Sequence, residues 1–253
     1  MEALKNKLWI WGHPTNSLKG IFGLTKTSTV SVVDAVNEFG AVGAIYVPMG
    51  RPCYRPSINA DMHTVKKTGW SMESEKDVLD LIEQKKEWDN LKIGIYDDFF
   101  SEANAQSNFT QYSVEKMIEL REKMHEAGLE MWVVFYTMQI DLDIWKNYLK
   151  VFDGVTLWLW DEPTNEEFDE KCKWFFKETE GQRRMIGCYL YNFGKEKEAT
   201  KESVRYQLDR NLEFVKDNKI EGIILHTNVV GGMSFEAYDE AKLWVKEHGE
   251  ELV

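Results

Sequence analysis

Residues 154–181 read GVTLWLWDEPTNEEFDEKCKWFFKETEG and contain one complete strand-and-helix unit. The run Val155–Trp160 is rich in β-branched and aromatic residues, which predicts a strand. Apolar residues at helical spacing predict a helix at Glu166–Glu180, and Gly181 follows at the position where helices commonly end. A short acidic stretch separates the two elements. This unit therefore predicts a strand, a helix and a polar strand end between them.

The same pattern recurs along the chain, with short β-rich runs alternating with longer amphipathic segments. Strands are predicted at Leu8–His13, Val42–Pro48, Ile93–Asp98, Met131–Thr137, Val155–Trp160, Met185–Tyr191 and Gly222–Asn228. Helices are predicted at Val30–Phe39, Ser74–Asn90, Ser113–Ala127, Leu142–Val151, Glu166–Glu180, Lys201–Asp217 and Ser234–His248. This alternation is typical of an α/β fold, and we expect a TIM-type (β/α) barrel with seven clear βα units and a possible eighth.

Two features of the pattern leave alternatives open. Gly50–Met72 could contain the eighth strand, but a long loop over the barrel mouth is favoured, because loops on that face carry substrate contacts and tolerate insertion. An open doubly wound sheet would usually carry a glycine-rich nucleotide loop after the first strand, where this chain reads GHPTNSLKG. We therefore expect no nucleotide cofactor.

Composition limits the classes of partner. With 253 residues and 43% hydrophobic content, residues 1–253 are expected to form a single barrel domain. The net charge of -12 disfavours nucleic acid and anionic membranes, and no stretch has the roughly 20 apolar residues that span a bilayer. Three cysteines without a CxxC pair predict reduced thiols. We expect a soluble, cytoplasmic protein, or a secreted one if a signal peptide has been removed; the sequence does not set an oligomeric state.

Carboxylates gather at two predicted strand ends, where barrels place their catalytic residues. In GVTLWLWDE the aliphatic positions should face the helices, which turns Trp160 and Glu162 toward the barrel axis. The same reasoning applied to IGIYDDFF points Ile93, Ile95 and Asp97 outward and turns Asp98 inward, so Asp98 and Glu162 form the preferred pair. Asp97 and Asp161 stay as substitutes, because a bulge can exchange neighbours. Alternatively, Asp161 and Glu162 only cap the helix that follows.

The remaining strand ends carry the side chains that a sugar site needs. Flat apolar surfaces for stacking come from Trp11, Tyr136, Trp160 and Tyr191, and neutral hydrogen-bonding groups from His13, Asn192, His226 and Asn228. No lysine lies near the C-terminal end of a predicted strand, which argues against a Schiff base, and Arg51 and Arg55 are the nearest cations. The chain has no HxH or HExxH spacing, so we expect no metal and no other cofactor.

Five phrases resemble a group of known proteins: WGHP, GIYDDFF, LWLWDEP, GCYLYNFG and IEGIILHTN. They are similar to phrases of uncharacterised bacterial (β/α) barrel proteins that are loosely grouped with glycoside hydrolases. The resemblance implies carbohydrate chemistry centred on Asp97 and Asp98. We therefore expect a glycoside hydrolase-like barrel that acts on a glycosidic bond and binds a carbohydrate or another neutral small polyol. The alternatives are a non-catalytic carbohydrate-binding barrel and a lyase or isomerase that depends on a divalent metal.

Overall fold

A computed structural model describes residues 1–15, 18–47, 62–100, 112–139 and 144–253. Its larger sheet consists of β1 (Leu8–Gly12), β2 (Gly43–Tyr46), β3 (Lys67–Met72), β4 (Leu91–Tyr96), β5 (Glu130–Tyr136), β6 (Gly154–Trp158), β7 (Arg183–Tyr189) and β10 (Gly222–His226). A second sheet consists of β8 (Tyr191–Asn192) and β9 (Lys197–Glu198). The helices are α1 (Val32–Phe39), α2 (Glu75–Lys85), α4 (Val114–Glu126), α5 (Trp145–Tyr148), α6 (Asn165–Glu178), α7 (Lys201–Lys216) and α8 (Glu236–His248).

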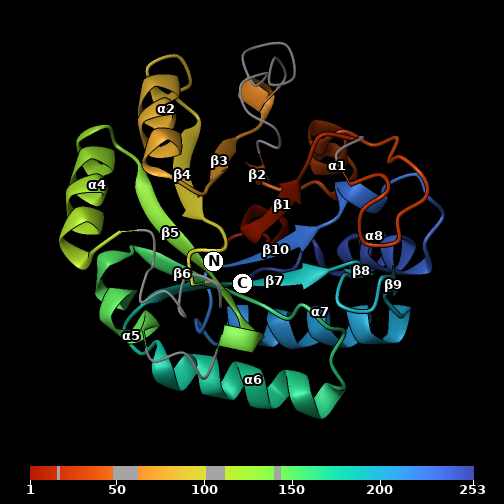
Figure 1. Cartoon of the computed structure of the whole chain (residues 1–253). Helices are drawn as coiled ribbons and strands as arrows, with labels where there is room; N and C mark the ends of the chain where they lie inside the picture. The colour runs from red at the N-terminus through yellow and green to blue at the C-terminus, as the bar shows by residue number, and fades with distance from the viewer. Residues whose placement is uncertain (16–17, 48–61, 101–111, 140–143) are drawn as a thin grey trace.

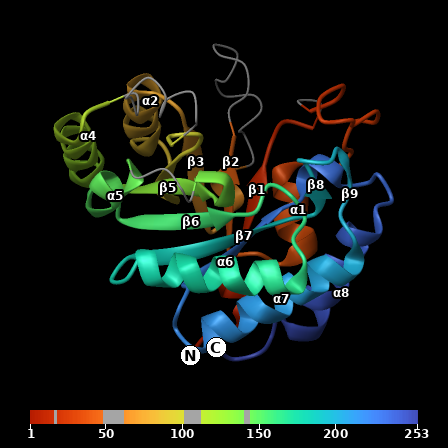
Figure 2. The same cartoon turned by 60° about the horizontal axis from the view of Figure 1, so that its bottom comes forward.

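In this described part of the chain, the eight strands of the larger sheet close into a barrel in the order β1-β10-β7-β6-β5-β4-β3-β2. Every neighbouring pair is parallel, and the helices lie around the outside (Figure 1, Figure 2). The two chain ends lie side by side, and Ala3 forms an antiparallel bridge with Leu252. The predicted (β/α) barrel is confirmed.

The eighth strand is β3, in the segment for which a long loop was the favoured prediction. Lys67–Met72 pairs with β2 on one side and β4 on the other, so the loop prediction is wrong for these residues. The strand begins at Lys67, directly after Lys66, and includes Gly69, a residue that is rare in strands. This composition hides the strand in the sequence. Arg51 and Arg55 lie outside the described residues.

Side-chain caps fix where several helices begin. Thr164 accepts a hydrogen bond from the backbone N–H of Glu167, and the Glu167 side chain accepts one from the Thr164 N–H, which forms a capping box at the start of α6. The cap of this helix is therefore Thr164, and neither Asp161 nor Glu162 caps it. Gly181 has a φ of 80°, the left-handed conformation that a glycine adopts with little strain after a helix.

Tryptophans fill much of the barrel interior, and glycines on neighbouring strands make room for them. A Cβ atom added at Gly43, Gly154 or Gly187 would overlap the ring of Trp9, Trp132 or Trp158, respectively. The interior cluster combines these rings with aliphatic side chains: Trp9, Trp11, Val42, Ile45, Val47, Ile93, Ile95, Trp132, Val134, Tyr136, Trp158, Met185 and Ile224. A larger apolar layer packs between the strands and the helices. Among the described residues, no helix is long and apolar enough to cross a membrane.

Candidate active site

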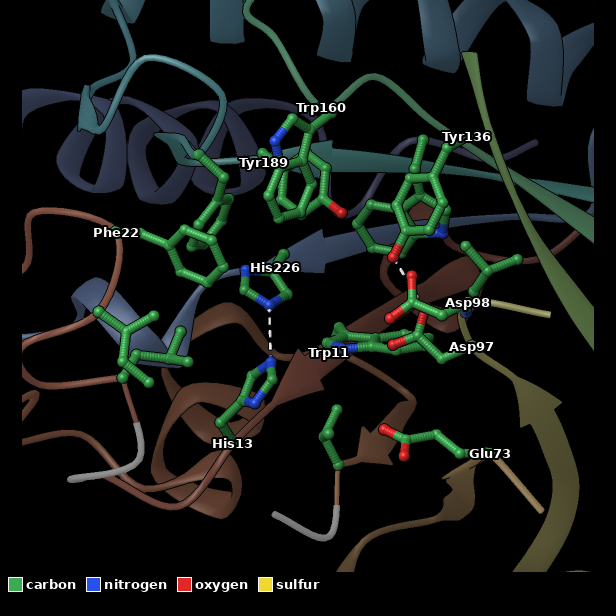
Figure 3. Close-up of a pocket in the computed structure, with 16 residues that line it drawn as sticks. Trp11, His13, Phe22, Glu73, Asp97, Asp98, Tyr136, Trp160, Tyr189 and His226 are labelled. Atoms are coloured by element: carbon green, nitrogen blue, oxygen red, sulfur yellow. Dashed lines mark hydrogen bonds between the residues drawn. The ribbon is translucent and has the colours of Figure 1, made fainter. Parts of the chain in front are cut away.

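A pocket of about 350 Å³ lies at the C-terminal ends of the barrel strands, the end at which barrels of this type carry their sites. Its volume falls near the lower limit of roughly 300 Å³ that is usual for small-molecule pockets. Figure 3 shows the side chains that line it. They are Trp11, His13, Leu18, Ile21, Phe22, Val47, Glu73, Asp97, Asp98, Val134, Tyr136, Trp158, Trp160, Tyr189, Phe193 and His226.

Asp97 follows the last residue of β4 and faces the pocket, because β4 turns the opposite way from the prediction. Ile93 and Ile95 belong to the barrel interior, whereas Tyr96 belongs to the layer under the helices. Gly94 faces the same outer layer, where an added Cβ would overlap Leu81 and Met72. Alternation along the strand then places Asp97 on the interior side. The prediction that residues 93, 95 and 97 point outward is wrong.

The Asp97 carboxyl group binds a proton unusually tightly for an aspartic acid. Its Oδ1 accepts hydrogen bonds from the Tyr136 hydroxyl at 2.8 Å and from the Asp98 N–H at 3.0 Å (Figure 3). The side chain keeps some solvent exposure through the open pocket, but protein atoms surround it. This burial, followed by repulsion from Asp98, raises the pKa of Asp97 from an ordinary value of 3.8 to about 7, although both hydrogen bonds oppose the rise. Asp97 can therefore carry a proton close to neutral pH.

Asp98 lines the same pocket from a less usual backbone conformation. Its φ is 51°, in the left-handed region, which aspartate tolerates better than most residues and which is frequent at functional sites. Its side chain is more open to solvent than that of Asp97, and partial burial raises the pKa of Asp98 above its ordinary value. Both sequence-predicted aspartates therefore reach the pocket, with Asp97 the more enclosed.

Two histidines form a neutral pair in the pocket wall. The Nε2 atoms of His13 and His226 lie 3.0 Å apart, so one ring donates the hydrogen bond that the other accepts. Burial lowers the pKa of His13 to about 4, and burial together with the neighbouring His13 lowers that of His226. Both rings are therefore uncharged at neutral pH. In the view of Figure 3, the histidines lie on one side of Trp11 and the aspartates on the other.

Aromatic rings form much of the remaining wall. Trp160 stacks on Phe193 with ring centroids 5.4 Å apart, and Trp11 meets Trp158 edge to face at 5.3 Å. Phe22, from the segment after β1, packs edge to face against Trp160. Such surfaces bind the apolar faces of ring-shaped ligands through their area and their π systems.

The structure separates Glu162 and Asp161 from the pocket lining. The Oε1 of Glu162 accepts hydrogen bonds from the backbone N–H of Thr200, at 2.7 Å, and from its hydroxyl group. Because Thr200 is the N-cap of α7, Glu162 supports the start of that helix. Asp161 is exposed and lies against Gly194. The predicted pairing of Asp98 with Glu162 across the mouth is therefore not the arrangement of the structure.

Three predicted sugar-binding residues hold the surrounding segments and do not line the pocket. The Tyr191 hydroxyl donates to the Phe22 carbonyl at 2.7 Å, and the Asn192 side chain accepts from the Lys195 N–H at 3.0 Å. Asn228 accepts from the His13 N–H at 2.9 Å and donates to the His13 carbonyl at 2.8 Å. These contacts position Phe22 and His13. By contrast, the pocket is lined by Trp11, His13, Tyr136, Trp160 and His226, whose role in sugar binding stays a prediction.

Glu73 and Phe22 line the pocket without having been predicted. Glu73 follows β3, so assigning the eighth strand would have identified it as a strand-end acid. Phe22 lies in an irregular segment with no periodic pattern, and no signal in the sequence points to it.

Within the described ranges, no group of three or more histidine, cysteine, aspartate or glutamate side chains could hold a metal ion. The histidine pair also lacks a typical feature of metal ligands, which usually donate their second ring N–H to a protein group. In the described structure, the Nδ1 atoms of His13 and His226 are buried without such a partner. The pair does not fit a metal site of the usual kind.

No protein-family model matches this chain, and a search of curated proteins found no significant match. Solved structures share its fold. A family 18 chitinase from Crocus vernus is 10% identical with a TM-score of 0.55, covering 94% of this chain and 99% of the chitinase. A xylanase-alpha-amylase inhibitor protein solved with trehalose is 10% identical with a TM-score of 0.58, covering 95% and 98%. A tryptophan synthase alpha-subunit from Pyrococcus furiosus is 10% identical with a TM-score of 0.51, covering 98% of each chain. At this identity the likeness shows a common barrel architecture and no common activity.

Proposed function

We propose that this protein is a glycoside hydrolase and that Asp97 is its acid. The observation that carries the proposal is the Asp97 carboxyl group, which is hydrogen-bonded to Tyr136 inside an aromatic-lined pocket and holds a proton near neutral pH. A glycosidic oxygen is a poor leaving group until it is protonated, and a carboxyl group with a raised pKa supplies that proton in many glycosidases.

The proposed reaction uses an acid, a nearby carboxylate and an apolar surface for the sugar ring. A sugar ring lies against the aromatic wall, and Asp97 transfers its proton to the glycosidic oxygen as the bond from that oxygen to the anomeric carbon breaks. The sugar acquires oxocarbenium character, which the nearby Asp98 carboxylate stabilises. Water then attacks the anomeric carbon and gives a proton to Asp97, which restores the acid. One glycosidic bond and one water molecule become two hydroxyl-bearing products.

The second candidate is a carbohydrate-binding barrel without turnover. The stacked rings of Trp160 and Phe193 favour it, because they would hold a sugar whether or not Asp97 reacts. A neighbour in fold is described as an inhibitor protein, so this architecture also occurs outside enzymes.

Turnover of a panel of oligosaccharides and aryl glycosides by the wild type and Asp97→Asn separates the two candidates. The variant keeps an oxygen that can accept the Tyr136 hydrogen bond but carries no acidic proton. We expect the variant to lose at least about a hundredfold in rate, the usual contribution of a general acid, while still binding the sugar. Sugar binding by both proteins with no turnover by either would support the binding barrel.

A further inference from the structure

Among the described residues that line the pocket, every side chain that can carry a charge at neutral pH is acidic. Its acidic side chains are Glu73, Asp98 and Asp97, of which Asp97 holds a proton up to about pH 7, and no lysine or arginine of the described ranges lines the pocket. His13 and His226 add no positive charge, because burial keeps them neutral. The ligand therefore meets a pocket with an acidic side and an uncharged histidine side (Figure 3).

Several carboxylates of this protein pair with arginine side chains, whereas Asp97 and Asp98 pair with no cation of the described residues. Asp169 pairs with Arg210 at 2.8 Å, and Glu240 pairs with Arg205 at 3.0 Å. Within the described part of the chain, no ion pair involves Asp97 or Asp98, and their contacts are a tyrosine hydroxyl and a backbone N–H. Partial burial of the Asp98 carboxylate disfavours its charged form, and a cationic ligand beside it would stabilise that form.

The aromatic wall adds a second, independent attraction for positive charge. The faces of tryptophan and tyrosine rings carry negative potential and attract ammonium groups within about 6 Å. Trp11, Trp158, Trp160 and Tyr189 surround the same space that Asp98 faces. A ligand with one charged nitrogen and an otherwise neutral ring would use the acidic side, the aromatic wall and the neutral histidine side at once.

We propose that the sugar bound in this pocket carries a free, protonated amine, as an unacetylated hexosamine does. This inference rests on the proposed glycosidase function and specifies its substrate class. The ammonium group contacts the Asp98 carboxylate, while the sugar ring lies on the aromatic wall beside the uncharged histidine pair. A neutral hexose or an N-acetylated sugar offers no charge for Asp98 to bind.

Calorimetric titration of the wild type with glucosamine, N-acetylglucosamine and glucose at neutral pH tests this preference. Glucosamine should bind about tenfold more tightly than the other two sugars, which corresponds to the free energy that one hydrogen bond to a charged group contributes. The advantage should shrink as salt is added. It should disappear in Asp98→Asn, in which asparagine also tolerates the left-handed backbone. Asp239→Asn removes an exposed carboxylate from α8 and should keep the full preference.

Equal affinity for the three sugars, or an unchanged preference in Asp98→Asn, would overturn the inference. Tighter binding of tetramethylammonium than of glucosamine would do so too, since it would indicate a ligand that is not a sugar. Cleavage assays on oligomers of the three sugars separate this inference from the hydrolase proposal. Cleavage of neutral oligomers alone would contradict the preference for a protonated amine and leave the hydrolase proposal intact. Asp98-dependent binding of glucosamine without cleavage of any oligomer would support the preference for a protonated amine and contradict the hydrolase proposal.

Discussion

The raised pKa of Asp97 has a consequence for stability that can be measured without any substrate. The folded protein holds the Asp97 proton up to about pH 7, whereas the unfolded chain releases it near pH 3.8. Below about pH 4 both states bind the proton and Asp97 has no effect. As the pH rises from about 4 to about 7, only the unfolded state ionises, so the free energy of unfolding falls. The difference of about 3 between the two pKa values corresponds to about 4 kcal/mol.

Asp97→Asn removes this ionisation and should therefore make the protein more stable at neutral pH. Its free energy of unfolding relative to that of the wild type should increase by up to about 4 kcal/mol between about pH 4 and about pH 8. Urea unfolding at a series of pH values measures the difference. Asp239→Asn, on the surface of α8, is the control and should follow the wild type. If wild type and Asp97→Asn keep a constant difference across this range, Asp97 does not have the environment described above.

Three further outcomes follow from the same site. First, kcat/KM on a cleaved glycoside should fall as the pH rises through about 7, because Asp97 loses the proton that it must donate; a rate that rises there would contradict its role as the acid. Second, Tyr136→Phe removes a hydrogen bond that favours the ionised carboxylate, so the midpoint of that fall should move to higher pH, and a downward shift would argue against this contact. Third, Glu162→Ala should lower the free energy of unfolding by about 1 kcal/mol through the loss of its contacts with Thr200, as measured by urea unfolding, and should leave turnover intact. A hundredfold loss of turnover in Glu162→Ala would instead support its earlier assignment as a catalytic partner.

The sequence predicts the barrel because its helices and most of its strands have strong periodic patterns. It predicts the inward side of β6 for the same reason, since aliphatic residues at 155, 157 and 159 alternate with Thr156, Trp158 and Trp160. The pattern fails on β4, where both sides of the strand are buried and apolar. Ile93 and Ile95 fill the interior there, while Tyr96 packs beneath the helices. Hydrophobicity alone cannot distinguish the two sides of such a strand.

Other parts of the site depend on contacts between distant segments. Glu162 contacts Thr200, which lies in a different βα unit. Tyr191 donates a hydrogen bond to the carbonyl of Phe22, 169 residues earlier in the chain. No local pattern predicts such contacts. Glu73 was missed for a simpler reason, because a closed barrel of this type requires an eighth strand and Lys67–Met72 was predicted to be a loop.

If Asp97 protonates a glycosidic oxygen, a crystal structure of Asp97→Asn with a bound oligosaccharide should show that oxygen beside residue 97. We predict a sugar ring on the aromatic wall, with the glycosidic oxygen within about 2.6–3.2 Å of the residue 97 side chain. The role of Asp97 as the acid would be contradicted if an oligosaccharide bound in the pocket with every glycosidic oxygen beyond hydrogen-bonding reach of residue 97.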